Sequence, residues 1–232
     1  MAVLVMSSPA AAVGPASAAE PPTQEQPRST WLVPGTGSLD GLGTFLYVAA
    51  PVPGPAQGSP LGYEYTMLMK YDDASYGVMV VGVKDGQKVA GFSLLKSHPR
   101  VATVPFDWQF GRFYYLLTYR IAPDVWAAWI YDWNATKWTH IATQEAPGIG
   151  RMLPTSDTVV DYQAGLLPTP AADPSNCAFY PRVDAFWYPP TGWRGAAMTR
   201  ATLSANSEAP GTCPSVTSSF HGWQRSTLGA SS

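Results

Sequence analysis

The chain has 232 residues and a formal net charge of −2, and only 13% of its residues are charged, whereas it contains 21 glycines and 23 prolines. That balance favours many short strands joined by turns over long salt-bridged helices. Phosphate binding requires clustered lysine and arginine, which this sequence lacks, so nucleic acid is excluded as a partner.

The N-terminal segment has the composition of a secretory leader. Residues 1–19 combine a short apolar run with small residues ending in A-S-A-A, so we expect an extracellular protein. No Lys or Arg precedes Arg28 to supply the usual positive start, and an Ala-rich disordered tail is the alternative. Residues 20–30 are typical of a Pro-rich spacer, and one domain is expected over residues 31–232. No apolar run reaches the roughly 20 residues that a transmembrane helix needs.

From Tyr63 onward the residues alternate with the period of half-buried β-strands. The run that starts at Tyr63 has one apolar and one polar side. The runs Tyr76–Val83 and Lys88–Leu95 flank Asp85-Gly86, a pair typical of a tight type I′ hairpin. The apolar side of the first run comprises Tyr63, Tyr65, Met67, Met69 and Tyr71.

A further strand and a tryptophan-rich hairpin follow. The strand Phe113–Ile121 alternates Phe113, Tyr115, Leu117, Tyr119 and Ile121 with Tyr114, Leu116, Thr118 and Arg120. The segment Trp126–Trp138 holds four of the nine tryptophans and an N-A-T-K turn. Alternation places Ala127, Trp129, Tyr131 and Trp133 on one side of its first arm, and Trp126, Ala128, Ile130 and Asp132 on the other. The predicted later strands are Trp138–Thr143, Thr158–Tyr162, Val183–Tyr188, Ala196–Leu203 and Ser219–Gln224.

Cys177 and Cys213 are the only cysteines. In an exported chain an even pair predicts a disulfide, and closing this loop contributes about 4 kcal/mol on the chain-entropy model. A zinc site is disfavoured, because no histidine lies near either thiol.

Several aromatic landmarks follow one another in a recognisable order. They are F-S-L-L (92–95), V-P-F-D-W-Q-F-G-R-F-Y-Y-L-L-T-Y-R (104–120), W-A-A-W-I-Y-D-W-N-A-T-K-W-T-H-I-A-T (126–143), V-V-D-Y (159–162) and a late Cys177. This order resembles that of a family of secreted bacterial domains of unknown function, which are similar in layout to concanavalin-like and laminin-G-like jelly rolls. The resemblance implies an all-β, two-sheet antiparallel sandwich in which one sheet is curved and its concave face often holds a carbohydrate.

The aromatic hairpin predicts either a ligand platform or a sandwich core, because tryptophan and tyrosine serve both roles. His140 follows Trp138 by two residues on the same side of its strand, where it could hydrogen-bond a ligand. In the competing account, Trp129, Tyr131 and Ala127 pack between the sheets and Trp126 lies beneath the Pro-rich C-terminal third. Trp133 and Trp138, next to the turn, are then the least buried. The candidate ligand-binding residues are Trp126, Trp133, Trp138, His140 and Arg120.

No catalytic signature is recognised. The E-x-D-x-x-E strand motif of concanavalin-like hydrolases and the G-x-S-x-G elbow are both absent. Asp72, Asp73 and Asp173 offer weak support for calcium and are better explained as turn formers, so no cofactor is expected. Five further acids, which could be considered as catalytic carboxylates, are scattered singly: Glu64, Asp107, Asp132, Asp161 and Asp184.

The preferred hypothesis is a secreted, monomeric, non-catalytic domain that binds a polysaccharide or a cell-surface glycan. A glycoside hydrolase or polysaccharide lyase of the same fold is the first alternative, and a structural envelope protein is the second. Two carboxylates that face each other across a groove would favour the enzyme, and a groove lined only by aromatics and amides would disfavour it.

Overall fold

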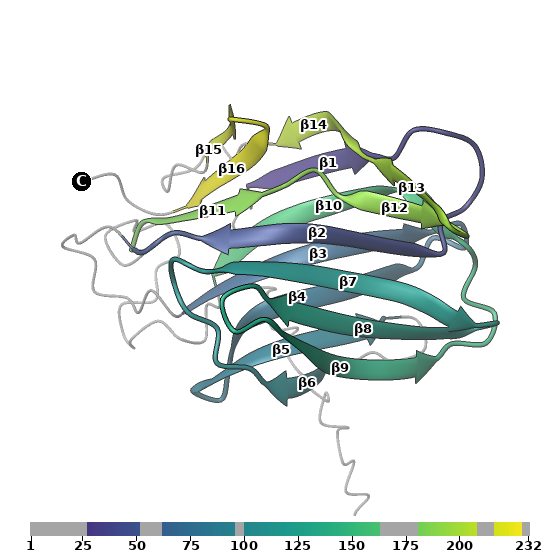
Figure 1. The fold of residues 1–232 in the computed structure, drawn as a ribbon, viewed down its shortest axis with the longest axis horizontal. Coiled ribbons are helices and arrows are strands. Elements are labelled where there is room, and N and C mark those ends of the chain that lie inside the picture. The colour runs from purple at the N-terminus through teal and green to yellow at the C-terminus, as the bar shows by residue number, and fades with distance from the viewer. Residues whose placement is uncertain (1–26, 52–61, 96–99, 163–180, 208–215, 229–232) are drawn as a thin grey trace, which may run out of the picture.

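The computed structural model describes residues 27–51, 62–95, 100–162, 181–207 and 216–228. Their strands form two antiparallel sheets that lie in two layers (Figure 1), and the predicted β-sandwich is therefore confirmed. In the described ranges, no helix has the length and apolar character that crossing a membrane requires.

The seven-stranded sheet has the order β14-β1-β10-β3-β4-β5-β6. Its strands are β1 (Arg28–Leu32), β3 (Tyr63–Tyr71), β4 (Tyr76–Lys84), β5 (Gln87–Leu94), β6 (Ala102–Pro105), β10 (Met152–Tyr162) and β14 (Thr202–Ser207). Arg28 pairs with Val159 of β10 and with Ser207 of β14. β1 therefore begins before residue 31, where the domain is expected to start.

The nine-stranded sheet has the order β15-β16-β11-β2-β7-β8-β9, and β12 joins β2 to β13. Its strands are β2 (Gly41–Val48), β7 (Phe113–Ala122), β8 (Val125–Asp132), β9 (Lys137–Glu145), β11 (Val183–Trp187), β12 (Thr191–Arg194), β13 (Ala197–Arg200), β15 (Val216–Phe220) and β16 (Trp223–Leu228). β7 pairs along one edge of β2. β11 and β12 pair with opposite ends of β2 and therefore share its other edge.

The core lies between the sheets, and in the central strands it is built from every second residue. All five apolar residues predicted for one side of β3 are buried there. Tyr71 of β3 meets the Trp126 ring of β8 edge-on at 5.5 Å, and Tyr65 meets Trp108 at 5.7 Å. The indole N–H groups of Trp108 and Trp31 donate to the Gly82 carbonyl and the Thr158 hydroxyl, which satisfies these buried donors.

The predicted hairpins are present. β4 and β5 pair up to Lys84 and Gln87, and Asp85 and Gly86 between them have φ values of 51° and 76°, as a type I′ turn requires. The tryptophan hairpin joins β8 to β9 and is likewise antiparallel.

Two later expectations need correction. The segment Ser219–Gln224 is no single strand, because His221 and Gly222 adopt positive φ and turn the chain from β15 into β16. The segment Ala196–Leu203 belongs to two strands that lie in different sheets, β13 and β14, with the buried Ala201 between them.

Candidate functional site

The outward side of the nine-stranded sheet is covered by aromatic rings. In β8 the alternation turns Trp126, Ala128 and Ile130 into the core and leaves Trp129 and Tyr131 outside it. The interpretation that Trp129 and Tyr131 pack between the sheets is therefore wrong. The outward rings, which we call the aromatic face, are Phe45, Tyr47, Phe113, Tyr115, Tyr119, Trp129, Tyr131, Trp133, Trp138, Phe186, Tyr188, Trp193 and Trp223.

Trp133 and Trp138 are the most exposed rings of this face, at 57% and 48%. The turn between them is fixed by Asp132, whose Oδ1 accepts hydrogen bonds from the backbone N–H groups of Asn134 and Ala135 at 2.8 and 2.9 Å. The backbone N–H of Trp133 also donates to the Phe113 carbonyl at 3.1 Å, which ties the start of this turn to β7. Both indoles are therefore held by a hairpin of defined geometry.

A glycine in β2 provides room for the rings of β7. A Cβ atom added to Gly43 would lie 2.5 Å from the Tyr115 hydroxyl oxygen, so the tyrosine lies across the bare backbone of β2. Tyr115 packs on Phe45, with ring centroids 4.6 Å apart, and burial raises the pKa of its hydroxyl above the ordinary range. The aromatic face is thus a packed layer in which single rings have little freedom.

A pocket of about 460 Å³ opens on this face. Its walls come from six segments that are far apart in the sequence. Trp133 meets Phe45 at 5.6 Å, and Tyr188 meets Trp223 at 4.9 Å. The lining residues are Phe45, Phe113, Trp133, Tyr188, Arg200 and Trp223.

The structure brings together three of the predicted ligand-binding residues, which are Trp133, Trp138 and His140. The His140 ring lies 5.8 Å from Trp129, and its Nε2 is 2.9 Å from the Thr143 hydroxyl. Trp126, in contrast, is 2% exposed and lies in the core, so it cannot contact a ligand on this face.

Arg120 is also separate from the aromatic face. It alternates with Tyr119 at the end of β7 and forms an ion pair with Asp40. The Gly195 backbone N–H donates to Asp40 Oδ2 at 2.8 Å. This hydrogen bond is the main reason why the pKa of the Asp40 carboxyl is lowered, and Arg120 lowers it further, whereas burial acts to raise it. Arg120 therefore serves to fasten the loop that precedes β2.

Other predicted sites lie elsewhere. Cys177, Cys213 and Asp173 fall outside the described residues. Asp72 accepts a hydrogen bond from the backbone N–H of Arg151 at 2.8 Å. Asp73 accepts one from the backbone N–H of Ser75 at 3.0 Å, so both acids shape the turn after β3.

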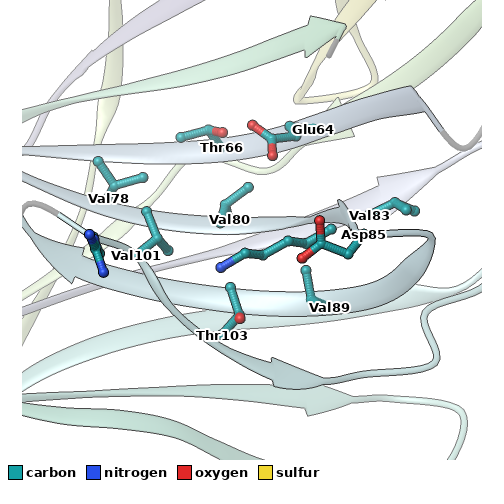
Figure 2. Close-up of a pocket in the computed structure, with 11 residues that line it drawn as sticks. Glu64, Thr66, Val78, Val80, Val83, Asp85, Val89, Val101 and Thr103 are labelled. Atoms are coloured by element: carbon teal, nitrogen blue, oxygen red, sulfur yellow. The ribbon is translucent and has the colours of Figure 1, made fainter. Parts of the chain in front are cut away.

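A second concavity lies on the outward side of the seven-stranded sheet. It has a volume of about 620 Å³ and an aliphatic floor that includes Val78, Val80 and Val89. Figure 2 shows Glu64 and Asp85 beside this floor, with Thr66 and Thr103 on opposite sides of it.

Carboxylates gather on the same side of the seven-stranded sheet. Glu64 of β3 and Asp161 of β10 occupy directly paired positions, which places their Cβ atoms about 5 Å apart. Asp157 is 1% exposed and accepts a hydrogen bond from the Thr30 hydroxyl at 2.7 Å. Its other oxygen lies 3.0 Å from the Lys70 ammonium, so this buried charge is compensated.

The comparisons with known proteins are limited to the fold. No family model and no curated protein matches the sequence. Among solved structures, scytalido-glutamic peptidase with a transition-state-analogue inhibitor is 9% identical with a TM-score of 0.54, over 89% of this chain and 100% of that one. SCP-B, of the eqolisin family of peptidases, in complex with the tripeptide Ala-Ile-His is 8% identical with the same TM-score and coverage. At identities this low, the likeness shows a shared sandwich architecture alone.

Proposed function

We propose that this chain is a secreted, non-catalytic recognition domain that binds a polysaccharide or cell-surface glycan on its aromatic face. The observation that carries the proposal is the exposure of Trp133 and Trp138 at the end of a continuous layer of rings. Apolar patches of this kind seldom remain bare without a partner. The residues of the N-terminal segment support export.

The chemistry of the face favours sugars over an aliphatic ligand. Each exposed indole offers a flat apolar surface to the C–H side of a sugar ring and one N–H donor to a hydroxyl. His140 and Thr143 add hydrogen-bonding groups beside the rings. Tyr115 and Phe45 pack on each other and are already fixed within the aromatic face. These side chains therefore lose little conformational freedom when a ligand binds.

The test compares glycan binding by three single variants. Trp133→Ala and Trp138→Ala each remove one stacking surface worth about 1–2 kcal/mol, and we expect roughly 5- to 30-fold weaker binding. The matched control is Tyr76→Ala, which removes a ring that is 45% exposed on the other sheet. Glycan arrays identify the ligand, and affinity electrophoresis measures the loss.

Unchanged binding by both tryptophan variants would remove the aromatic face from the binding site. A wild-type protein that binds no glycan at all would overturn the proposed function.

A hydrolase is the second candidate, and the paired carboxylates Glu64 and Asp161 favour it. Retaining glycoside cleavage needs one carboxyl group as proton donor and a second as nucleophile, and these two acids occupy paired positions of neighbouring strands. The solved structures of similar fold include peptidases with bound peptide or inhibitor, so peptides belong in the assay with polysaccharides.

Turnover by the wild-type protein that is lost in Glu64→Gln and in Asp161→Asn, and kept in Trp133→Ala, would establish the hydrolase. Absence of turnover on both substrate classes would exclude it.

A further inference from the structure

The pocket on the aromatic face contains one cation among its rings. Five of its six lining residues are aromatic, and the sixth is Arg200. The guanidinium carbon of Arg200 lies 4.8 Å from the centre of the Tyr188 ring, a cation–π distance that holds the side chain against the pocket wall. A ligand that stacks on these rings therefore meets a positioned positive charge.

The strand register explains why Arg200 reaches this pocket. Gly43 of β2 pairs with Thr191 of β12, which pairs in turn with Arg200 of β13. Paired residues in neighbouring strands point to the same side of a sheet. Arg200 thus shares the outward side with Tyr115, which lies across Gly43.

Among the described residues, no carboxylate is paired with the charge of Arg200. Asp184 of β11, an acid on the outward side of the same sheet, is already held by Arg225 at 2.6 Å and Arg182 at 3.9 Å. The β11–β16 end of the aromatic face consequently carries an excess of positive charge.

We propose that the pocket binds an acidic sugar, with the carboxylate of a uronic acid unit on Arg200 and the sugar ring stacked on Trp133 or Trp223. This inference rests on the proposed function and adds the ligand class to it. The planar guanidinium can bind a carboxylate through two parallel hydrogen bonds, which selects for charge and for orientation. A volume of about 460 Å³ lies within the usual range for small-ligand pockets.

The experiment uses two ligands that differ only at the carboxyl group, which is ionised in one and a neutral methyl ester in the other. Polygalacturonate and its fully methyl-esterified form are titrated against the full-length protein by calorimetry. We expect the wild-type protein to prefer the acid form at least about 10-fold, and added salt to reduce that preference. The variants are Arg200→Gln and Arg200→Lys. The matched control is Arg100→Gln, which removes an exposed arginine that lines the concavity on the seven-stranded sheet.

Arg200→Gln should abolish the preference without changing binding of the ester, Arg200→Lys should restore part of it, and Arg100→Gln should leave it intact. Equal binding of both ligands by the wild-type protein, or a preference that survives Arg200→Gln, overturns the acidic-sugar inference. The proposed function would then still stand, provided that the ester binds through Trp133. If neither ligand binds and glycan arrays are also negative, both proposals fail together.

Discussion

Asp157 illustrates how a single residue can carry a buried charge on the outer side of this sandwich. Its carboxylate is 1% exposed, although it projects from the outward side of β10, and Lys70 and Arg28 lie within 3.0 and 3.8 Å of it. A buried carboxylate is tolerated only when partners compensate the lost hydration. The Thr30 hydroxyl supplies a further hydrogen bond from β1, so this residue links three neighbouring strands.

We expect Asp157→Asn to lower the free energy of unfolding by about 2–4 kcal/mol, because it leaves the Lys70 ammonium facing an uncharged group. Urea denaturation measures the change. The control is Asp107→Asn, since the Asp107 side chain is 80% exposed and its ion pair with Lys88 spans 3.4 Å. Exposed pairs of that kind contribute at most about 1 kcal/mol, so similar losses in both variants would contradict the structural role assigned to Asp157.

At the scale of strands, the sequence predicts elements well where alternation and turn chemistry agree. The apolar side of β3 is buried as expected, and Asp85-Gly86 turns β4 into β5. The sequence does not predict β2, although this strand lies near the centre of its sheet. Its outward positions include Gly41 and Gly43, which hide the period-two pattern because the rings that cover them come from β7.

The same contrast applies to the candidate site. The exposure of Trp133 and Trp138 follows from their place beside a hairpin turn, where a side chain has few neighbours. Local sequence does not show that Tyr188, Arg200 and Trp223 complete a pocket with Trp133, because long-range strand pairing alone joins β13 and β16 to β2 and β7. The alternation in β8 also does not indicate which of its two sides faces outward, because the position of the second sheet decides where the core lies.

For the whole molecule, the sandwich sorts its nine tryptophans into three environments. Trp31, Trp108, Trp126 and Trp187 are buried in the core. Trp129, Trp193 and Trp223 are half-buried, while Trp133 and Trp138 are exposed. Because every exposed indole lies on one face, the quenching of tryptophan fluorescence by a solute in water reports mainly on that face.

We expect iodide to quench mainly Trp133 and Trp138, since a hydrated anion does not enter a close-packed core. The double variant Trp133→Phe, Trp138→Phe should lose the larger part of the quenching slope, whereas Trp187→Phe, which removes a ring with 0% exposure, should leave the absolute quenched intensity unchanged. A bound glycan should protect the wild-type protein in the same way as the double substitution does. If the double variant kept the wild-type slope, the accessible indoles would lie elsewhere, and the face that the sandwich presents to a ligand would have to be reassigned.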